Sequence, residues 1–295
     1  MTTDTRTRAD MCPGVWRPWQ ADDGLLVRIR LMGGLLPTAA LRRLSEASQH
    51  HGDGRIYLTR RANLQLRGLP GDGPQLTAAA VTALESTGLI PTRSHELVRN
   101  VLASPQTGLA GGYADLRPVI NRLDTLLCAN PHLGRLPGRF LFTLDDGRGD
   151  LLYRLTGAGR RGTDLGCVAL GDDVAQLRVG GLWGDVAPLA EVADRLAGLA
   201  SQFLDALGTG ADAPWHIREL ARPLQPPVDA DLRIPTPAPP LPYGPVPGGT
   251  HVPAEDGAVA RDLVQSLLEK ATDATHVVVT PWRGVLVPHT PEVSE

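Results

Sequence analysis

The sequence predicts an α+β fold, because short strands and amphipathic helices alternate near both ends of the chain and paired strands fill its middle. The first unit runs strand, helix, strand, helix, the order of an α+β or split βαβ unit. Thr38 is the candidate N-cap of its first helix, and its second strand segment reads as one strand or a bent pair of strands. The four segments lie at 24–34, 37–52, 55–68 and 74–88.

The middle of the chain, residues 95–220, predicts an antiparallel sheet with flanking helices. The segment 138–155 is expected to form a hairpin that turns at residues 145–147, which read Asp-Asp-Gly. A second hairpin is expected at 166–181. The flanking helices are expected at 114–130 and 185–208.

The last part of the chain echoes the first unit. A helix at 256–270 and a strand pair at 275–289 repeat its order. Thr280 then corresponds to Thr59, Gly284 to Asn63, and Val287 to Leu66, which indicates an internal repeat. The expected organisation is a lead-in (1–22), a first small unit (23–92), a middle domain (93–221), a proline-rich linker (222–253) and a second small unit (254–295).

Composition restricts the classes of function. Apolar residues make up 42% and charged residues 21% of the chain, and the formal net charge is -3. We therefore expect a packed core and no general nucleic-acid binding, so any anion site must be local. The sequence has no apolar run of membrane-spanning length and no signal peptide, which favours a cytoplasmic protein with no membrane partner.

The segment Tyr57–Gly68 concentrates positive charge without any acidic residue. If it is one continuous strand, alternation places Arg61, Asn63, Gln65 and Arg67 on a single polar face. Arginine side chains bind carboxylates and phosphates through two parallel hydrogen bonds, so such a face suits a ligand with several anionic groups. The alternative is an ordinary solvated surface.

Further basic and amide side chains extend this candidate site. Arg30 shares one face of the preceding strand with Arg28, and Arg99, Asn100 and Arg139 lie on the next strands expected along the chain. The cysteines and histidines give no such pattern, because the cysteine spacing fits no zinc or cluster motif and no histidine has two further ligands nearby. We therefore predict three reduced thiols, Cys12, Cys128 and Cys167, and no metal site.

Four segments together resemble the nitrite/sulfite reductase superfamily, and within it the precorrin-3B synthases of aerobic cobalamin biosynthesis. They read CPGVWRPWQADDGLLVRIRLMGG, GDGRIYLTRRANLQLRGL, RNVLASPQTG and LPGRFLFTLDDGRGD, and the resemblance extends from Cys12 to His289. It implies two ferredoxin-like half domains, at about 20–90 and 240–290, around a larger α+β domain.

The resemblance also implies roles for individual arginines. Arg30, Arg61, Arg99 and Arg139 would grip the acetate and propionate groups of a tetrapyrrole, and Arg283 of the second repeat would face the same cavity. The reductases carry a second basic residue where this chain has Leu141. That difference favours the precorrin enzyme over a sirohaem reductase.

The activity implied is that of a monooxygenase that hydroxylates precorrin-3A with dioxygen, using a [4Fe–4S] cluster and a non-haem iron. In the family the cluster cysteines lie in a second large domain, which this sequence is expected to lack. Three functions stay open: an oxidoreductase completed by a partner chain that carries the cluster, a non-catalytic tetrapyrrole-binding module, and a truncated inactive homologue.

Overall fold

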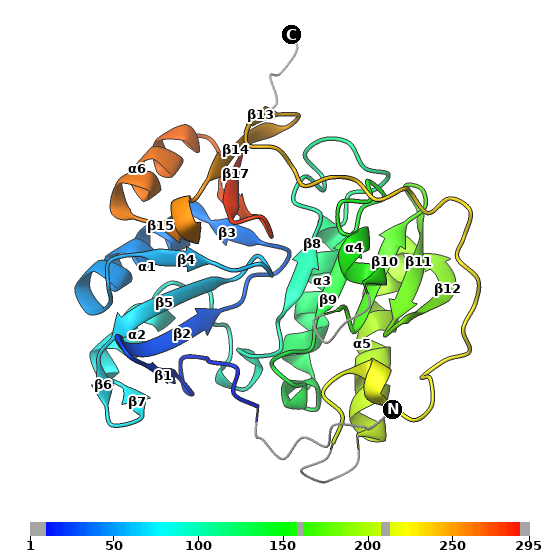
Figure 1. The fold of residues 1–295 in the computed structure, drawn as a ribbon, viewed down its shortest axis with the longest axis horizontal. Helices are drawn as coiled ribbons and strands as arrows, with labels where there is room; N and C mark the ends of the chain where they lie inside the picture. Colours follow the sequence, from blue (N-terminus) through cyan, green and yellow to red (C-terminus); the bar gives the residue numbers. More distant parts are fainter. Residues whose placement is uncertain (1–9, 158–161, 208–212, 290–295) are drawn as a thin grey trace.

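The computed structural model describes residues 10–157, 162–207 and 213–289, and it confirms the predicted α+β fold. Three five-stranded sheets and one two-stranded ribbon are present. Figure 1 shows two of the sheets together on one side of the molecule and the third on the other. In the described part of the chain, no helix is long and apolar enough to cross a bilayer. The start of the expected lead-in, residues 1–9, lies outside the described residues.

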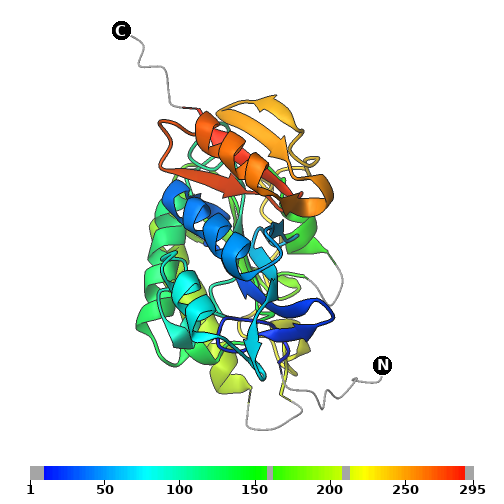
Figure 2. The same ribbon diagram turned by 90° about the vertical axis from the view of Figure 1, so that its left-hand side faces the viewer.

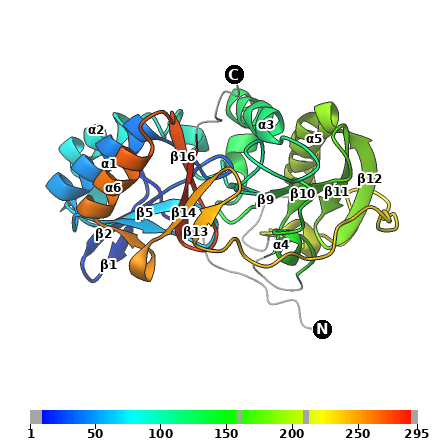
Figure 3. The same ribbon diagram turned by 90° about the horizontal axis from the view of Figure 1, so that it is seen from above.

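The sheet of the first half domain is antiparallel, with the strand order β1-β2-β5-β4-β15. Leucines and isoleucines face inward at alternate positions of its strands, as expected for a sheet that is covered on one face. Helix α1 packs on that face and α2 packs against α1 (Figure 3). The elements are β1 (Trp19–Ala21), β2 (Gly24–Ile29), α1 (Thr38–His51), β4 (Ile56–Leu58), β5 (Leu64–Leu69), the ribbon β6 (Gly71–Asp72) and β7 (Gln75–Leu76), α2 (Ala78–Glu85) and β15 (Ala258–Val259).

The sheet of the second half domain is also antiparallel, with the order β13-β14-β17-β16-β3. Helix α6 lies beside α1 on the same side of the two sheets (Figure 2). The elements are β3 (Leu35–Pro37), β13 (Gly244–Val246), β14 (Gly249–Pro253), α6 (Arg261–Lys270), β16 (His276–Val279) and β17 (Gly284–Pro288).

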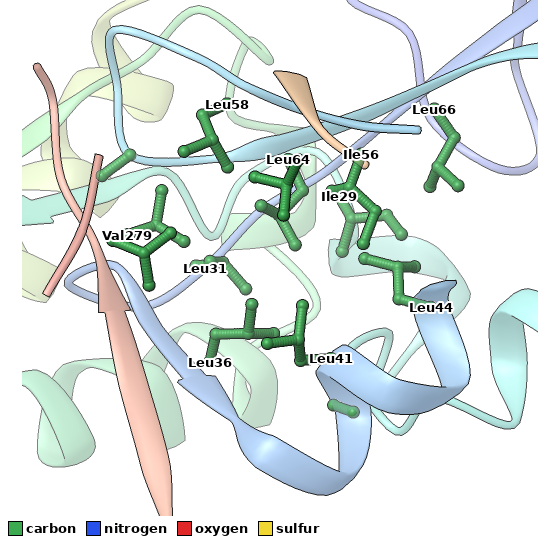
Figure 4. Close-up of a cluster of buried hydrophobic side chains, with 14 of the residues drawn as sticks. Ile29, Leu31, Leu36, Leu41, Leu44, Ile56, Leu58, Leu64, Leu66 and Val279 are labelled. Carbon is green, nitrogen blue, oxygen red and sulfur yellow. The ribbon is translucent and has the colours of Figure 1, made fainter. Parts of the chain in front are cut away.

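The two half domains exchange strands. β3, from the N-terminal part of the chain, pairs with β16, while β15, from the C-terminal part, pairs with β4. One apolar core therefore spans both units, and Leu44, Leu64 and Val279 all belong to it (Figure 4). The exchange also explains why Thr38 does not cap α1 as expected: Pro37 takes the N-cap position, and the Thr38 hydroxyl donates to the Thr275 carbonyl at the start of β16.

The middle sheet has the order β12-β11-β10-β9-β8 and is mixed rather than wholly antiparallel. β9 runs parallel to both β8 and β10, whereas β10, β11 and β12 are antiparallel, so the hairpin expected at 166–181 is present. Helices α3 and α5 pack side by side on this domain. The elements are β8 (Val101–Ala103), α3 (Arg117–Ala129), β9 (Phe142–Asp145), α4 (Leu152–Thr156), β10 (Leu165–Ala169), β11 (Val174–Val179), β12 (Leu182–Pro188) and α5 (Leu189–Ala206).

The hairpin expected at 138–155 does not form. The Asp145 carboxylate accepts backbone N–H bonds from Gly147, Gly149 and Leu151, so the chain after β9 closes into a wide loop instead of a tight reversal. That loop leads into helix α4. The sequence Asp-Asp-Gly is typical of a tight turn, but the buried Asp145 carboxylate fixes the next six residues of backbone in a wider loop.

The same loop holds a carboxyl group with a displaced pKa. Burial, followed by the charge of Asp145, raises the pKa of Asp150 to about 7. The unfolded value is about 4. Between these two pH values the folded protein holds a proton that the unfolded chain has released, so this group's contribution to stability falls as the pH rises through 7.

Asp150→Asn is therefore expected to raise the free energy of unfolding at pH 8 by about 1–3 kcal/mol, with little change at pH 4. The Asn amide oxygen can still accept the hydrogen bond that Ser104 Oγ donates to Asp150 at 2.7 Å. Urea unfolding of both proteins at the two pH values measures the difference. A variant that is less stable than the parent at pH 8 would show that the ionised carboxylate is needed in the fold.

The proline-rich segment joins the middle domain to the second half domain. It has no helix or strand from residue 220 to 243, in agreement with an extended linker. The end of the expected linker is different, because residues 244–253 form β13 and β14 of the second sheet.

The strand segment 55–68 is a bent pair, with a tight turn between β4 and β5 that recurs between β16 and β17. In both turns the threonine N–H donates to the carbonyl of the residue four positions later, Thr59 to Asn63 at 2.9 Å and Thr280 to Gly284 at 2.9 Å. Ala62 and Arg283 adopt matching positive φ angles of 54° and 61°. The turns therefore superpose the residues that the sequence repeat aligned.

Candidate anion-binding site

A cleft of about 860 Å³ lies between the first half domain and the middle domain. One wall comes from β2, β5 and the turn between β4 and β5. The other wall comes from Gly138 and Arg139 and from helix α4, and the lead-in residues 11–13 line the cleft as well. The site is therefore built from at least five separate stretches of sequence.

Six arginines line this cleft, and no aspartate or glutamate among the described residues does. Burial lowers the pKa of Arg30 to about 10, and burial also lowers the pKa values of Arg28 and Arg61. Guanidinium groups with a pKa near 10 or above still carry their charge at neutral pH. We call this set the arginine cleft, and its arginines are Arg28, Arg30, Arg60, Arg61, Arg139 and Arg154.

Three of the arginines, Arg30, Arg61 and Arg154, donate to backbone carbonyl oxygens, which carry no formal charge. Arg61 Nη1 donates to the Arg139 carbonyl at 2.9 Å, and Arg30 Nη1 donates to the Pro13 carbonyl at 3.2 Å. Within the described residues, the Nε–H groups of Arg28 and Arg154 are buried without an acceptor. Clustered guanidiniums with free donors are the arrangement that binds anions bidentately.

The turn of residues 59–63 decides which side chains enter the cleft. Because β4 ends at Leu58 and β5 begins at Leu64, side chains do not alternate through this segment as they would in one continuous strand. Arg60 and Arg61 both line the cleft, although alternation predicted opposite faces. Two consecutive arginines in a segment that was expected to bend could have indicated that both side chains enter the cleft.

Asn63 and Asn100 line the cleft, and they also connect its two walls. Asn63 Nδ2 donates to Asn100 Oδ1 at 2.7 Å, and Asn63 Oδ1 accepts from the Leu31 N–H at 2.9 Å. Asn100 Nδ2 donates to the Phe140 carbonyl at 2.9 Å. These buried bonds fix the turn against the middle sheet, so both amides have a structural role. Gln65, also in the cleft, accepts a bond from Arg28 Nη2 at 3.3 Å.

Three of the predicted site arginines lie elsewhere. Arg67 forms an ion pair with Asp23 at 2.9 Å, and Arg99 pairs with Asp124 at 2.6 Å. Arg283 is exposed, and its side chain lies against Gly257. Both carboxylate partners are far away in sequence, which is why a local count of charges around the strand missed them.

The space beside the turn of the second repeat is occupied by side chains in the described part of the chain. The ring of His251 occupies the strand position that corresponds to Arg28, and it packs against Tyr243 with 4.6 Å between ring centroids. His251 Nε2 lies 3.0 Å from the Thr280 hydroxyl. The end of the linker thus fills the space that is open in the first repeat.

Comparison with known proteins gives several matches, including two curated relatives and one solved structure. A stretch of 85 residues is 39% identical to a precorrin-3B synthase from Sinorhizobium sp, covering 28% of this chain and 18% of that protein. A stretch of 123 residues is 31% identical to a ferredoxin–nitrite reductase from Leptolyngbya laminosa, covering 39% of this chain and 23% of that protein. The solved structure of the Mycobacterium tuberculosis NirA protein matches with a TM-score of 0.67 and 20% identity, over 94% of this chain and 59% of that one.

Residues 20–73 also match the nitrite/sulfite reductase ferredoxin-like half domain. The chain is therefore similar to nitrite/sulfite reductase proteins in this half domain and to the NirA protein in its fold. The matches span about a fifth of the length of the two curated relatives. The matched half domain supplies β2, β5 and the turn, and hence four of the six cleft arginines.

Iron chemistry, which the superfamily implies, finds no ligand set in the described part of the chain. No group of three or more histidine, cysteine, aspartate or glutamate side chains is placed there to hold a metal ion. Cys12 lines the cleft, Cys128 lies on α3, and Cys167 lies in the core on β10; burial raises the pKa of all three thiols. The described residues therefore do not fit a [4Fe–4S] cluster or a non-haem iron.

Proposed function

We propose that the chain binds a precorrin-type tetrapyrrole with several carboxylates in the arginine cleft, as part of a precorrin-3B synthase-like oxidoreductase of aerobic cobalamin biosynthesis. The observation that carries this proposal is the set of six cleft arginines, with no carboxylate among the described residues that line the cleft. Six like charges gathered in one cleft repel each other, and a polyanionic ligand would offset this repulsion.

The rest of the cleft suits a flat, partly apolar ring. Trp19, with 43% of its side chain exposed, and Met11, with 49% exposed, line the cleft together with Leu26. A macrocycle can bury its ring against these side chains while its carboxylates reach the arginines. The cleft volume falls within the range of about 300–1,000 Å³ that is common for ligand sites.

The oxidation step is proposed only for an assembly that includes a second, cluster-bearing polypeptide. The described residues of this chain supply binding and orientation of the substrate, and no step through iron is derived from them. A tetrapyrrole-binding module without redox chemistry is the second candidate, favoured by the same lack of metal ligands.

Titration with uroporphyrin I, a porphyrin with eight carboxylates, tests the binding step. We expect saturable binding at 50 mM salt, visible as quenching of tryptophan fluorescence, and an affinity that falls at least tenfold at 500 mM salt because charge pairs at an open cleft are screened. A chain that does not bind the porphyrin at low salt would contradict the proposal.

Turnover separates the two candidates. Precorrin-3A, dioxygen and a cluster-bearing partner are expected to give hydroxylated product only when this chain is present. Binding of uroporphyrin I without turnover under these conditions would favour the binding module.

A further inference from the structure

We propose that Arg154, together with Arg60 and Tyr153, forms a second carboxylate subsite on the α4 side of the arginine cleft, which contacts a different edge of the ligand from Arg30, Arg61 and Arg139. This inference rests on the proposed tetrapyrrole binding and names a specificity determinant within it. None of these three residues was predicted from the sequence as part of the site.

Helix α4 is anchored so that Tyr153 and Arg154 reach the cleft. Its Leu152 and Leu155 side chains are buried in a small cluster with Val168. Thr163 Oγ1 donates to the Arg154 carbonyl at 3.1 Å, which fixes the backbone at the same point. Tyr153 keeps 45% of its surface exposed at the cleft wall, and Arg154 is half-buried beside it.

The guanidinium of Arg154 is positioned but not neutralised. Its Nη2 donates to the Arg60 carbonyl at 2.8 Å, and its Cζ lies 5.1 Å from the centroid of the Tyr153 ring. Its buried Nε–H has no acceptor in the described part of the chain. The free donors of this fixed fork therefore suit an incoming carboxylate.

Arg60 and Arg61, which are neighbours in the turn of residues 59–63, form hydrogen bonds to different parts of the middle domain. The side chain of Arg61 is bonded to the Arg139 carbonyl, whereas the carbonyl of Arg60 holds Arg154. Two neighbouring residues thus connect the turn to two different parts of the middle domain. A ligand with carboxylates on several edges can use both groups of arginines, while a ligand with carboxylates on one edge uses only the larger group.

Two porphyrins distinguish these cases. Uroporphyrin I carries carboxylates around the whole ring, and deuteroporphyrin IX carries two propionates on one edge. Arg154→Gln is expected to weaken uroporphyrin I binding about tenfold and to change deuteroporphyrin IX binding less than twofold. Arg154→Lys, which keeps the charge but loses the fork, should fall between the parent and Arg154→Gln. Arg233→Gln, an exposed residue paired with Asp231, is the control and should match the parent protein.

The outcomes separate the subsite from the proposed function. Equal weakening of both porphyrins by Arg154→Gln would mean that Arg154 only braces the turn, and unchanged binding of both would remove it from the site. Either result overturns the subsite and leaves tetrapyrrole binding intact. Failure of the parent protein to bind either porphyrin would overturn both proposals. Thermal unfolding of each variant shows whether a loss of affinity reflects a loss of fold.

Discussion

Arg61→Ala is expected to weaken the binding of uroporphyrin I by about 10- to 100-fold, since a hydrogen bond between charged groups contributes about 1.5–3 kcal/mol. Arg61 lies in the turn and lines the cleft, and burial lowers its pKa. Its Nη1 is fixed by the Arg139 carbonyl, which leaves the remaining N–H groups for the ligand. The measurement is the dissociation constant from fluorescence titration at 50 mM salt.

Arg67→Ala is the matched control, because Arg67 belongs to the same arginine-rich segment but forms an ion pair with Asp23 outside the cleft. Its affinity for uroporphyrin I should remain within twofold of the parent value. Comparable losses in the two variants would mean that the segment acts through its overall charge and not through the cleft.

Asp164→Ala is expected to lower the free energy of unfolding by about 3–5 kcal/mol, because it removes one member of a buried polar network. Both carboxylate oxygens of Asp164 lie 3.1 Å from His216 Nδ1. They also accept the N–H groups of Leu141 at 3.0 Å and Ile217 at 3.1 Å. Alanine would leave the imidazole and two backbone donors buried without acceptors.

Urea unfolding followed by circular dichroism measures this change. Asp194→Ala provides the control, because Asp194 pairs with Arg122 on the surface and half of its side chain is exposed. Its unfolding midpoint should stay close to that of the parent. A similarly mild effect of Asp164→Ala would show that the network contributes little to the fold.

Local patterns in the sequence predicted much of the fold. The helical pattern at 37–52 corresponds to α1, and the hairpin signal at 166–181 to β10 and β11. Hydrophobic periodicity reports which face of an element is buried, and α1 is buried on one face, whereas β10 and β11 are buried at nearly every position. The pairings of β3 with β16 and β15 with β4 were not predicted, since they join residues more than 190 positions apart.

The predicted and observed residues of the site can be compared in the same way. That Arg30, Arg61 and Arg139 bind a ligand stays a prediction, but all three line the cleft. Arg99 does not, because Asp124 on α3 binds its guanidinium. Arg154 was missed because the loop organised by Asp145 replaces the expected hairpin with a helix. Distant carboxylates thus decide which arginines are free, and the sequence alone does not show them.

The most direct measurement of the central claim is a crystal structure of the chain with bound uroporphyrin I. We expect the macrocycle to occupy the arginine cleft, with carboxylates within hydrogen-bond distance of Arg30, Arg61 and Arg139. At least one further carboxylate should form a hydrogen bond with Arg154. A porphyrin bound at another surface, with the arginine cleft empty, would contradict it.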